Sequence, residues 1–418
     1  MTHRYTPSLH SLVAIVSSPR VGDDAQQLDE EHKDVEEPEG NENQEPVPLY
    51  LLVQVQRQED EEDQHEEPVI MEQIIWESGG PEDVAAYRIP LLIQVPTGDL
   101  LAFSEARKYS TRDSGAKFIA MRRSSNGGDS WGPNTFILNN YNVPDGTNLG
   151  TITVDRLNNR LILIHTFCIH SATVCVNGTG EKPAGTYMIT SPDWGYSWSE
   201  PVYLADGNPL LKNLHYNPGP GYGIQKMYEP HKGRLVTCGQ GRYSLFCLTS
   251  DDNGTTWQMT PGLMKIPYQL SSMKTGDFEP GEVQVIELKN GTLLINARNQ
   301  MSFHCHCRIQ ALSFDGGETF PLPYVTLKEE LIDPRVCGSL LPFGDILFFS
   351  NPFNPSQRVN LTLHWSMDSG ETYPNFLTLY EKSSGYSCLS TIDENHIGLV
   401  YEKDDLKYIS FLKIQLNL

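Results

Sequence analysis

An eight-residue pattern recurs five times between residues 124 and 373, and it constrains the fold more than any other feature of the sequence. Each copy reads Ser, any residue, Asp or Asn, any residue, Gly, any residue, Ser or Thr, and an aromatic residue. The copies are Ser124–Trp131, Ser191–Trp198, Ser250–Trp257, Ser313–Phe320 and Ser366–Tyr373. Their first residues lie 67, 59, 63 and 53 positions apart, and a period of this size indicates repeated structural units.

The residue types in this pattern are those of a tight hairpin turn. An Asp or Asn side chain can accept hydrogen bonds from backbone N–H groups two residues further on, Gly tolerates positive φ, and a hydroxyl closes the turn. The final aromatic side chain is expected to pack in the hydrophobic layer between neighbouring sheets. We therefore interpret all five copies as structural turns and expect none of them in an active site.

The stretches between the repeats have the composition of β-strands, as in LLAFSEAR (100–107), RLILIHTF (160–167) and TLLINARN (292–299). Few stretches show a helical period, and turn residues recur throughout, which indicates an all-β chain. Units of about sixty residues with about four strands each are typical of a β-propeller. Residues 71 to 418 number 348, or six units of 58, so the sequence predicts a six-bladed β-propeller.

The acidic residues are concentrated at the N-terminus. Residues 1 to 70 contain 18 acidic and 4 basic residues, in a chain whose net charge is −22. We expect residues 1 to 68 to be a largely disordered acidic region and residues 69 to 418 to be the propeller domain. A regulatory acidic tail is the alternative, and the apolar stretch Val47–Val55 could add one strand or a transient docking segment.

Charge and hydropathy also exclude classes of partner. A strongly acidic chain is a poor match for nucleic acid or for an anionic membrane surface, because both attract basic patches. The sequence has no apolar run of about 18 residues, so we expect no integral membrane segment.

Several longer motifs resemble the sialidase (neuraminidase) family, whose members share such repeats under the name Asp boxes. The motifs include YRIP (87–90), INARNQ (295–300), RVNLTL (358–363), SGYS (384–387) and VYEK (400–403). The resemblance extends over about residues 71 to 418 and is greatest to the animal lysosomal sialidase. It implies an exo-α-sialidase, a glycoside hydrolase that removes terminal α-linked sialic acids from glycoproteins, oligosaccharides and glycolipids such as gangliosides. We expect no cofactor and no metal.

The resemblance also implies how the substrate is bound. Sialic acid carries a carboxylate on its anomeric carbon, and the planar fork of arginine pairs with a carboxylate through two hydrogen bonds. The arginines implied to bind this carboxylate are Arg88, Arg298 and Arg358. Arg107 matches a further arginine near the sugar, and Glu402 matches the carboxylate that holds Arg88. Glu105 shares a strand face with Arg107 and is a second candidate for such support.

The catalytic residues follow from the same resemblance. A neutral tyrosine hydroxyl avoids the repulsion between an anionic nucleophile and the substrate carboxylate, and sialidases are an exception to the two-carboxylate rule of glycosidases. Tyr386 matches the nucleophile and Glu282 its base, although Glu279 lies three residues away. Asp113 matches the acid that protonates the leaving group, with a solvated turn residue as the alternative. Two successive inversions predict net retention.

The cysteines and histidines are expected to be structural. His304, Cys305, His306 and Cys307 alternate, so on a strand the two histidines point away from the two cysteines and cannot form one metal site. We therefore interpret them as buried strand residues. In an oxidising lumen we expect Cys168 to pair with Cys175, and Cys238 with Cys247.

Two other function classes remain as alternatives, because Asp boxes also occur in propellers without catalysis. A sialoglycan-binding module or a scaffold would not need Tyr386, Glu282 and Asp113 together with three arginines. The resemblance implies a lysosomal location and, as partners, cathepsin A and β-galactosidase. The first residues contain only the short apolar core Leu12–Val16, so the signal peptide is unconvincing. A cytoplasmic or membrane-associated location is therefore the alternative.

Overall fold

The computed structural model describes residues 70–80, 82, 84–139, 145–170, 183–212, 216–241, 244–264, 278–300 and 305–416. The described elements are strands and three short 3₁₀-helices, η1 (Leu204–Asp206), η2 (Pro209–Lys212) and η4 (Leu322–Tyr324). The predicted all-β class is confirmed. The acidic region, residues 1 to 68, lies outside the described residues.

The strands form five sheets. The first consists of β2 (Ala86–Gln94), β3 (Leu100–Arg107), β4 (Lys117–Ser124) and β5 (Thr135–Asn139). The second consists of β6 (Thr147–Asp155), β7 (Arg160–Phe167), β8 (Gly185–Ser191), β9 (Val202–Tyr203) and β11 (Gly221–Tyr222). The third consists of β10 (Asn217–Pro218), β12 (Ile224–Gln225), β13 (Leu235–Gln240), β14 (Ser244–Ser250), β15 (Gln258–Met259) and β16 (Leu263–Met264). The fourth consists of β17 (Pro280–Glu287), β18 (Leu293–Asn299), β19 (Cys307–Ser313) and β20 (Val325–Ile332).

The fifth sheet has seven strands. They are β21 (Ser339–Phe343), β22 (Ile346–Pro352), β23 (Val359–Ser366), β24 (Asn375–Thr391), β25 (His396–Lys403), β26 (Tyr408–Gln415) and β1 (Ile70–Glu77). The long strand β24 pairs with β23 up to Ser383 and with β25 from Ser384 onwards. It therefore belongs to two successive groups of four strands.

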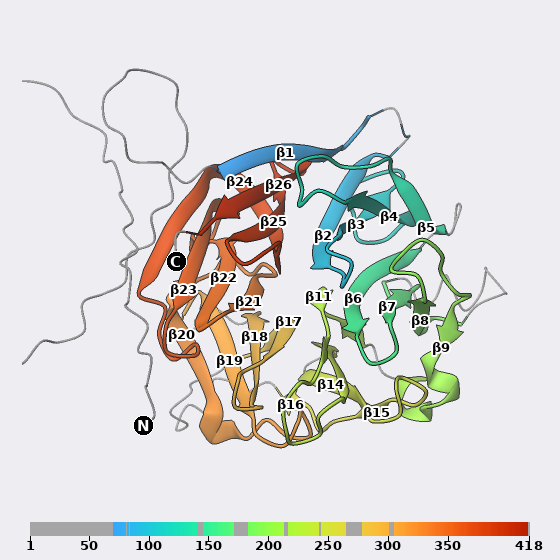
Figure 1. Cartoon of the computed structure of the whole chain (residues 1–418), viewed down its shortest axis with the longest axis vertical. Helices are drawn as coiled ribbons and strands as arrows, with labels where there is room; N and C mark the ends of the chain where they lie inside the picture. The colour runs from blue at the N-terminus through green and yellow to red at the C-terminus, as the bar shows by residue number, and fades with distance from the viewer. Residues whose placement is uncertain are drawn as a thin grey trace, which may run out of the picture.

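The sheets follow one another around a common centre in a propeller-like ring, with β2, β6, β11, β17 and β21 nearest the middle (Figure 1). The ring is closed by β1, which pairs antiparallel with β26 so that Ile70 lies opposite Ile414 and Glu77 opposite Tyr408. Strands far apart in sequence thus carry their side chains to one central region.

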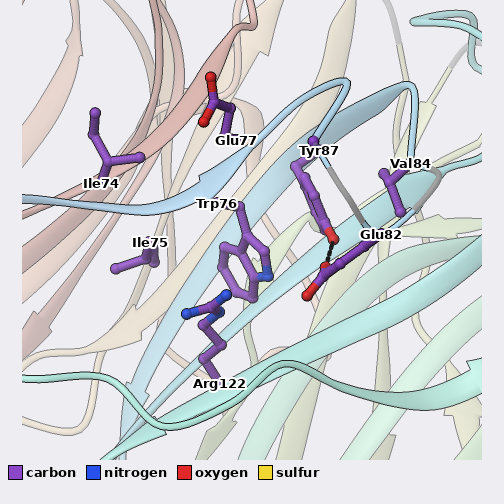
Figure 2. Close-up of a pocket in the computed structure, with 9 residues that line it drawn as sticks. Ile74, Ile75, Trp76, Glu77, Glu82, Val84, Tyr87 and Arg122 are labelled. Atoms are coloured by element: carbon purple, nitrogen blue, oxygen red, sulfur yellow. Dashed lines mark hydrogen bonds between the residues drawn. The ribbon is translucent and has the colours of Figure 1, made fainter.

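The ring closure is reinforced by aromatic packing at the junction of β1 and the first sheet (Figure 2). Trp76 stacks on Tyr87 with ring centroids 5.6 Å apart, and its Nε1 donates to Asn134 Oδ1 at 3.0 Å. The Tyr87 hydroxyl donates to Glu82, and the Arg122 guanidinium lies 5.9 Å from the Trp76 ring. These contacts attach the last sheet to the first.

The five Asp boxes form turns, as predicted, but their hydrogen bonds span a longer segment than expected. In the box that starts at Ser250, Asp252 Oδ1 accepts from the backbone N of Thr256 at 2.9 Å, four residues on, rather than two. The Ser250 hydroxyl accepts from Gly254 N at 2.8 Å, and Gly254 has φ +75°. The final aromatics Trp257, Phe320 and Tyr373 are buried, which confirms their packing role.

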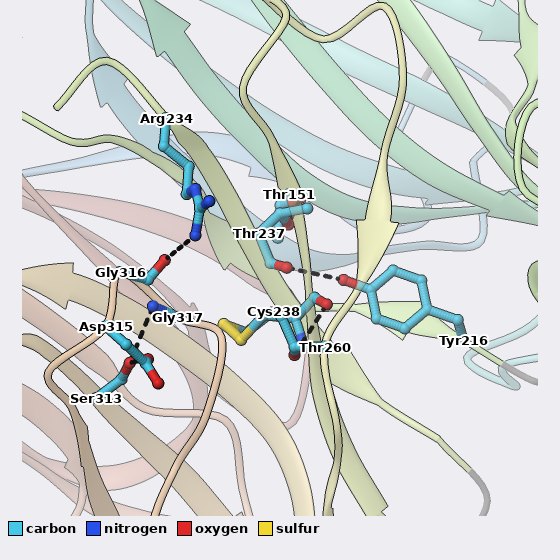
Figure 3. The surroundings of a disulfide bond; sticks show 11 residues. Thr151, Tyr216, Arg234, Thr237, Cys238, Thr260, Ser313, Asp315, Gly316 and Gly317 are labelled. Carbon is cyan, nitrogen blue, oxygen red and sulfur yellow. Dashed lines mark hydrogen bonds between the residues drawn. A yellow bond between two sulfur atoms is a disulfide. The ribbon is translucent and has the colours of Figure 1, made fainter. Parts of the chain in front are cut away.

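One of the two predicted cysteine pairs is confirmed. A disulfide joins Cys238 and Cys247, which lie directly opposite each other on β13 and β14 (Figure 3). Cys168 is also disulfide-bonded, and its predicted partner Cys175 lies outside the described residues.

The interpretation as buried strand residues is wrong for Cys305 and His306, but it is confirmed for Cys307. Cys305 and Cys307 form a disulfide and their Cα atoms are 5.1 Å apart, whereas two residues of extended strand span about 6.6 Å. The bridge keeps Cys305 and the exposed His306 out of β19, which begins at the buried Cys307. His304 lies outside the described residues, and no metal-binding group of three ligands occurs among those that are described.

Within the part of the chain that the structure describes, no helix has the length and apolarity needed to cross a membrane.

Candidate active site

Three of the predicted site residues lie at β-bulges of central strands. The pairing register shifts between Arg88 and Leu91 in β2, between Pro280 and Val283 in β17, and between Ser384 and Ser387 in β24. A bulge adds a residue to one strand and redirects the neighbouring side chains. Arg88, Glu282 and Tyr386 therefore lie at or within irregular segments of their strands. Pro90 and Pro280 fit these positions, because proline cannot donate to a sheet and is tolerated at bulges.

Glu402 on β25 holds Arg88 in place. The Arg88 Nε–Glu402 Oε1 distance is 2.6 Å, and the same carboxylate accepts from the backbone N of Ile89 at 3.0 Å and of Tyr386 at 3.1 Å. Burial raises the pKa of Glu402, but Arg88 and the two N–H groups outweigh burial, so its pKa lies below the ordinary value. A Cβ at Gly385 would lie 2.1 Å from Glu402 Oε2, so only glycine fits there.

Tyr386, Glu282 and Arg298 are in mutual contact. The Tyr386 hydroxyl donates to Glu282 Oε1, and Arg298 Nη1 donates to Glu282 Oε2 at 2.9 Å and to the Tyr386 oxygen at 3.3 Å. Burial and the charge of Glu282 raise the pKa of Tyr386 well above its usual range. Tyr386 is therefore neutral at physiological pH, with a carboxylate at its hydroxyl.

The three predicted carboxylate-binding arginines surround Tyr386. The guanidinium carbons of Arg88 and Arg358 lie 5.8 and 5.4 Å from the Tyr386 ring centroid, and Arg298 contacts its oxygen. Among the described residues, the buried Arg298 Nε has no hydrogen-bond partner. Among the described residues, the carboxylates in direct contact with these three guanidinium groups are those of Glu282 and Glu402, so these five side chains together carry one positive charge in excess.

Arg107 connects a buried carboxylate to the exposed Asp113. Arg107 Nη1 lies 2.9 Å from Asp113 Oδ1, and Arg107 Nη2 lies 2.7 Å from Glu105 Oε2. Glu105 therefore supports an arginine, as expected. Burial raises the pKa of Asp113, but the charges of Arg107 and Arg88 outweigh burial and lower it. Because Arg88 acts on Asp113 electrostatically, the Asp113 loop and the arginine cluster border one site.

Lys117 was missed by sequence reasoning. It lies on β4 with no exposed surface, donates to Asn148 Oδ1 and is 3.9 Å from Glu105 Oε2. Burial lowers its pKa, with Arg107 acting in the same direction and Glu105 opposing it. The sequence offers only a weak signal for it, a lysine at the start of an apolar strand.

The fold and the site define a β-propeller with an anion-binding cluster around a neutral tyrosine. The model of the BNR repeat-like domain matches residues 98–401. The chain is 28% identical over 368 residues to a sialidase of Micromonospora viridifaciens, covering 82% of this chain and 54% of that protein. It is 26% identical over 404 residues to Sialidase-3 of Mus musculus, covering 78% and 90%. The chain thus spans about half the length of the bacterial relative.

Among solved structures, the Hadza microbial sialidase Hz136 matches with a TM-score of 0.65 and 23% identity, over 81% of this chain and 67% of that one. This likeness indicates a shared fold. The protein belongs to the BNR repeat-like family, and the sialidase family predicted from the sequence is confirmed.

Proposed function

We propose that the protein is an exo-α-sialidase that releases terminal α-linked sialic acids with retention, using Tyr386 as the nucleophile. The observation that carries this proposal is the hydrogen bond from the Tyr386 hydroxyl to Glu282 within a cluster of three arginines. The substrate carboxylate accepts hydrogen bonds from Arg88, Arg298 and Arg358. The buried Arg298 Nε has no acceptor among the described residues, so it is available to donate to this carboxylate.

The reaction then proceeds in two displacements. The Tyr386 oxygen bonds to the anomeric carbon while its proton passes to Glu282, and Asp113 protonates the glycosidic oxygen so that the aglycone leaves as an alcohol. Water next attacks the anomeric carbon and gives a proton to Asp113. The bond to Tyr386 breaks, and its oxygen recovers the proton from Glu282.

Hydrolysis of a fluorogenic α-sialoside, at about pH 4.5 and about pH 7, tests the activity directly. We expect turnover that depends on the α-linkage. Tight binding of the sialoside without turnover would instead identify a sialoglycan-binding module, and neither binding nor turnover would favour a scaffold.

The pairing of β24 supports a count of six blades, because its two halves complete two four-stranded groups in the seven-stranded sheet. With the other four sheets this gives six, within one domain from about residue 69 to 418. A crystal structure with any other number of four-stranded groups would contradict the count.

Deletion of residues 1 to 68 is expected to leave kcat and KM toward a small sialoside within about twofold of the full chain. All eight proposed site residues lie between residues 88 and 402, and β1 begins at Ile70. Steady-state kinetics of the two proteins provide the measurement. A folded, truncated protein without activity would show that the acidic region completes the site.

Removal of the Arg107 charge is expected to move the activity profile to higher pH. Asp113 must be protonated to act as the acid, and Arg107 lowers its pKa, so activity falls as pH rises through that pKa. In Arg107→Met, the Asp113 pKa rises, and the basic limb of kcat/KM moves up by roughly one unit. Arg112→Met is the control, because Arg112 is adjacent in sequence but is not among the largest influences on the Asp113 pKa. If the basic limb of the kcat/KM profile lies at the same pH in Arg107→Met as in wild type, Asp113 is not the acid.

The natural substrates are proposed to be sialylated glycoproteins, oligosaccharides and glycolipids, and the location the lysosome. The described disulfides support an oxidising compartment, and the lowered Asp113 pKa supports action at acidic pH. Cathepsin A and β-galactosidase are the proposed partners. Colocalisation with a lysosomal marker and co-purification of the two partners would test these points, and a cytoplasmic location would contradict them.

A further inference from the structure

A buried ion pair fixes the loop of residues 333 to 338, which joins β20 to β21. Arg308 Nη1 lies 3.1 Å from Asp333 Oδ2, and the exposed fractions of the two side chains are 0% and 1%. Asn351 Nδ2 donates to the same Asp333 oxygen at 3.0 Å. Asp333 Oδ1 accepts from Val336 N at 3.0 Å, and Arg308 Nη1 donates to Val336 O at 2.5 Å. Both backbone polar groups of Val336 are therefore held by this pair.

The loop presents a backbone carbonyl to the active site. Arg335 has φ +61°, a conformation that residues other than glycine keep only where the surrounding structure imposes it. Its carbonyl accepts from Arg358 Nη2 at 3.3 Å. The Arg335 carbonyl thus lies where it contacts one of the three arginines around Tyr386.

Arg358 differs from the other two arginines in the kind of partner that it contacts. Arg88 is paired with Glu402 and Arg298 with Glu282. Among the residues that the structure describes, Arg358 has no carboxylate partner; its contacts are the Arg335 carbonyl and the Tyr386 ring. A long, partly exposed side chain with so few contacts would otherwise sample many rotamers, and fixing it in advance reduces the cost of binding.

We propose that Arg308 and Asp333 are positioning residues for Arg358, so that a buried ion pair without substrate contact sets part of the affinity for the substrate carboxylate. This inference rests on the proposed function, in which Arg358 binds that carboxylate. The ion pair acts through Val336 and the Arg335 carbonyl, and neither Arg308 nor Asp333 touches the substrate.

The test variant is Asp333→Asn, which keeps the shape of the side chain but removes its charge. The new amide donors face the donors of Arg308 and Asn351, so the loop loses its fixed geometry. Because Arg358 contacts the carboxylate in both ground state and transition state, KM is expected to rise about tenfold with kcat within about twofold. The Kd of free N-acetylneuraminic acid, measured by calorimetry, is expected to rise by the same factor.

The matched control is Glu287→Gln, which neutralises another buried ion pair. Glu287 Oε1 lies 2.5 Å from Lys226 Nζ, and the carboxylate also accepts from the backbone N of Met227 and Tyr228. Glu287 is five residues along β17 from Glu282, about 17 Å away. We expect a lower Tm in both variants, but an unchanged KM and Kd in the control. A purely structural role for Asp333 would lower the amount of active protein, and hence apparent kcat, without changing KM.

The inference is overturned if folded Asp333→Asn keeps the wild-type KM and Kd, or if Glu287→Gln raises them equally. If Asp333→Asn does not fold, the same KM and Kd are measured for Arg308→Lys, which retains the buried charge but loses the forked contacts of arginine. Wild-type values of KM and Kd in Arg308→Lys also overturn the inference. A wild-type protein that binds N-acetylneuraminic acid but hydrolyses no sialoside refutes the proposed function alone, and the Kd comparison still applies. A protein that does neither refutes both.

Discussion

Replacement of Tyr386 by phenylalanine is expected to lower kcat by about a thousandfold or more while the protein stays folded. The substitution removes only the oxygen that donates to Glu282, and it leaves the aromatic ring beside Arg88 and Arg358. The Kd of free N-acetylneuraminic acid is therefore expected to stay within about threefold of wild type, since the arginines that bind the carboxylate are unchanged. Steady-state kinetics and calorimetry provide both values.

Tyr216→Phe is the control for this experiment. Tyr216 is also buried, and its hydroxyl donates to the Thr237 carbonyl at 3.2 Å, away from the arginine cluster. Loss of that bond is expected to cost about 1 kcal/mol of stability and to leave kcat unchanged. Near wild-type turnover by folded Tyr386→Phe would require another nucleophile.

Replacement of Glu402 by glutamine is expected to have the largest effect on stability, about 3–5 kcal/mol, because it leaves the Arg88 charge buried without its partner. Glu402 also accepts two backbone N–H groups, from Ile89 and Tyr386, so the same change disturbs both strands of the site. Chemical denaturation at about pH 7 would measure the loss of unfolding free energy. Asp345→Asn, in the exposed pair with Lys289, is the control and is expected to cost less than about 1 kcal/mol.

The effect of Glu402→Gln is expected to depend on pH. The folded-state pKa of Glu402 lies below its ordinary value of 4.5, so its ionised form stabilises the protein above that value. This contribution is lost as pH falls from about 4.5 through the lower folded-state pKa. The difference between wild type and Glu402→Gln should therefore shrink in acid. A difference that stays constant down to about pH 2 would show that the Glu402 charge does not hold Arg88.

The sequence predicts the fold class and a set of candidate site residues, but it does not give the geometry of that site. Asp boxes and strand composition predict an all-β repeat, because turn chemistry and alternation are local properties. Arg88 and Glu402 are 314 positions apart, and only the closed ring brings them together. The resemblance names both residues without giving the irregular strand segments on which Arg88, Glu282 and Tyr386 lie.

The contacts that sequence reasoning missed are also non-local. Arg358 donates to the Arg335 carbonyl, and Arg308 on β19 pairs with Asp333 in the loop after β20; these residues have no recognisable motif. Lys117 is buried against Glu105 and Asn148, although its residue type favours the surface. The alternation of His and Cys over residues 304 to 307 predicts a strand that includes Cys305. The disulfide to Cys307 interrupts this strand pattern.

The stereochemistry of the first product tests the central claim most directly. Proton NMR during the first minutes of hydrolysis of an α-sialoside distinguishes the two anomers of free sialic acid before they equilibrate. Attack by Tyr386, followed by attack of water on the same anomeric carbon, predicts that the α-anomer appears first. Early appearance of the β-anomer would mean a single displacement by water, and it would contradict the assignment of Tyr386 as the nucleophile with Glu282 as its base.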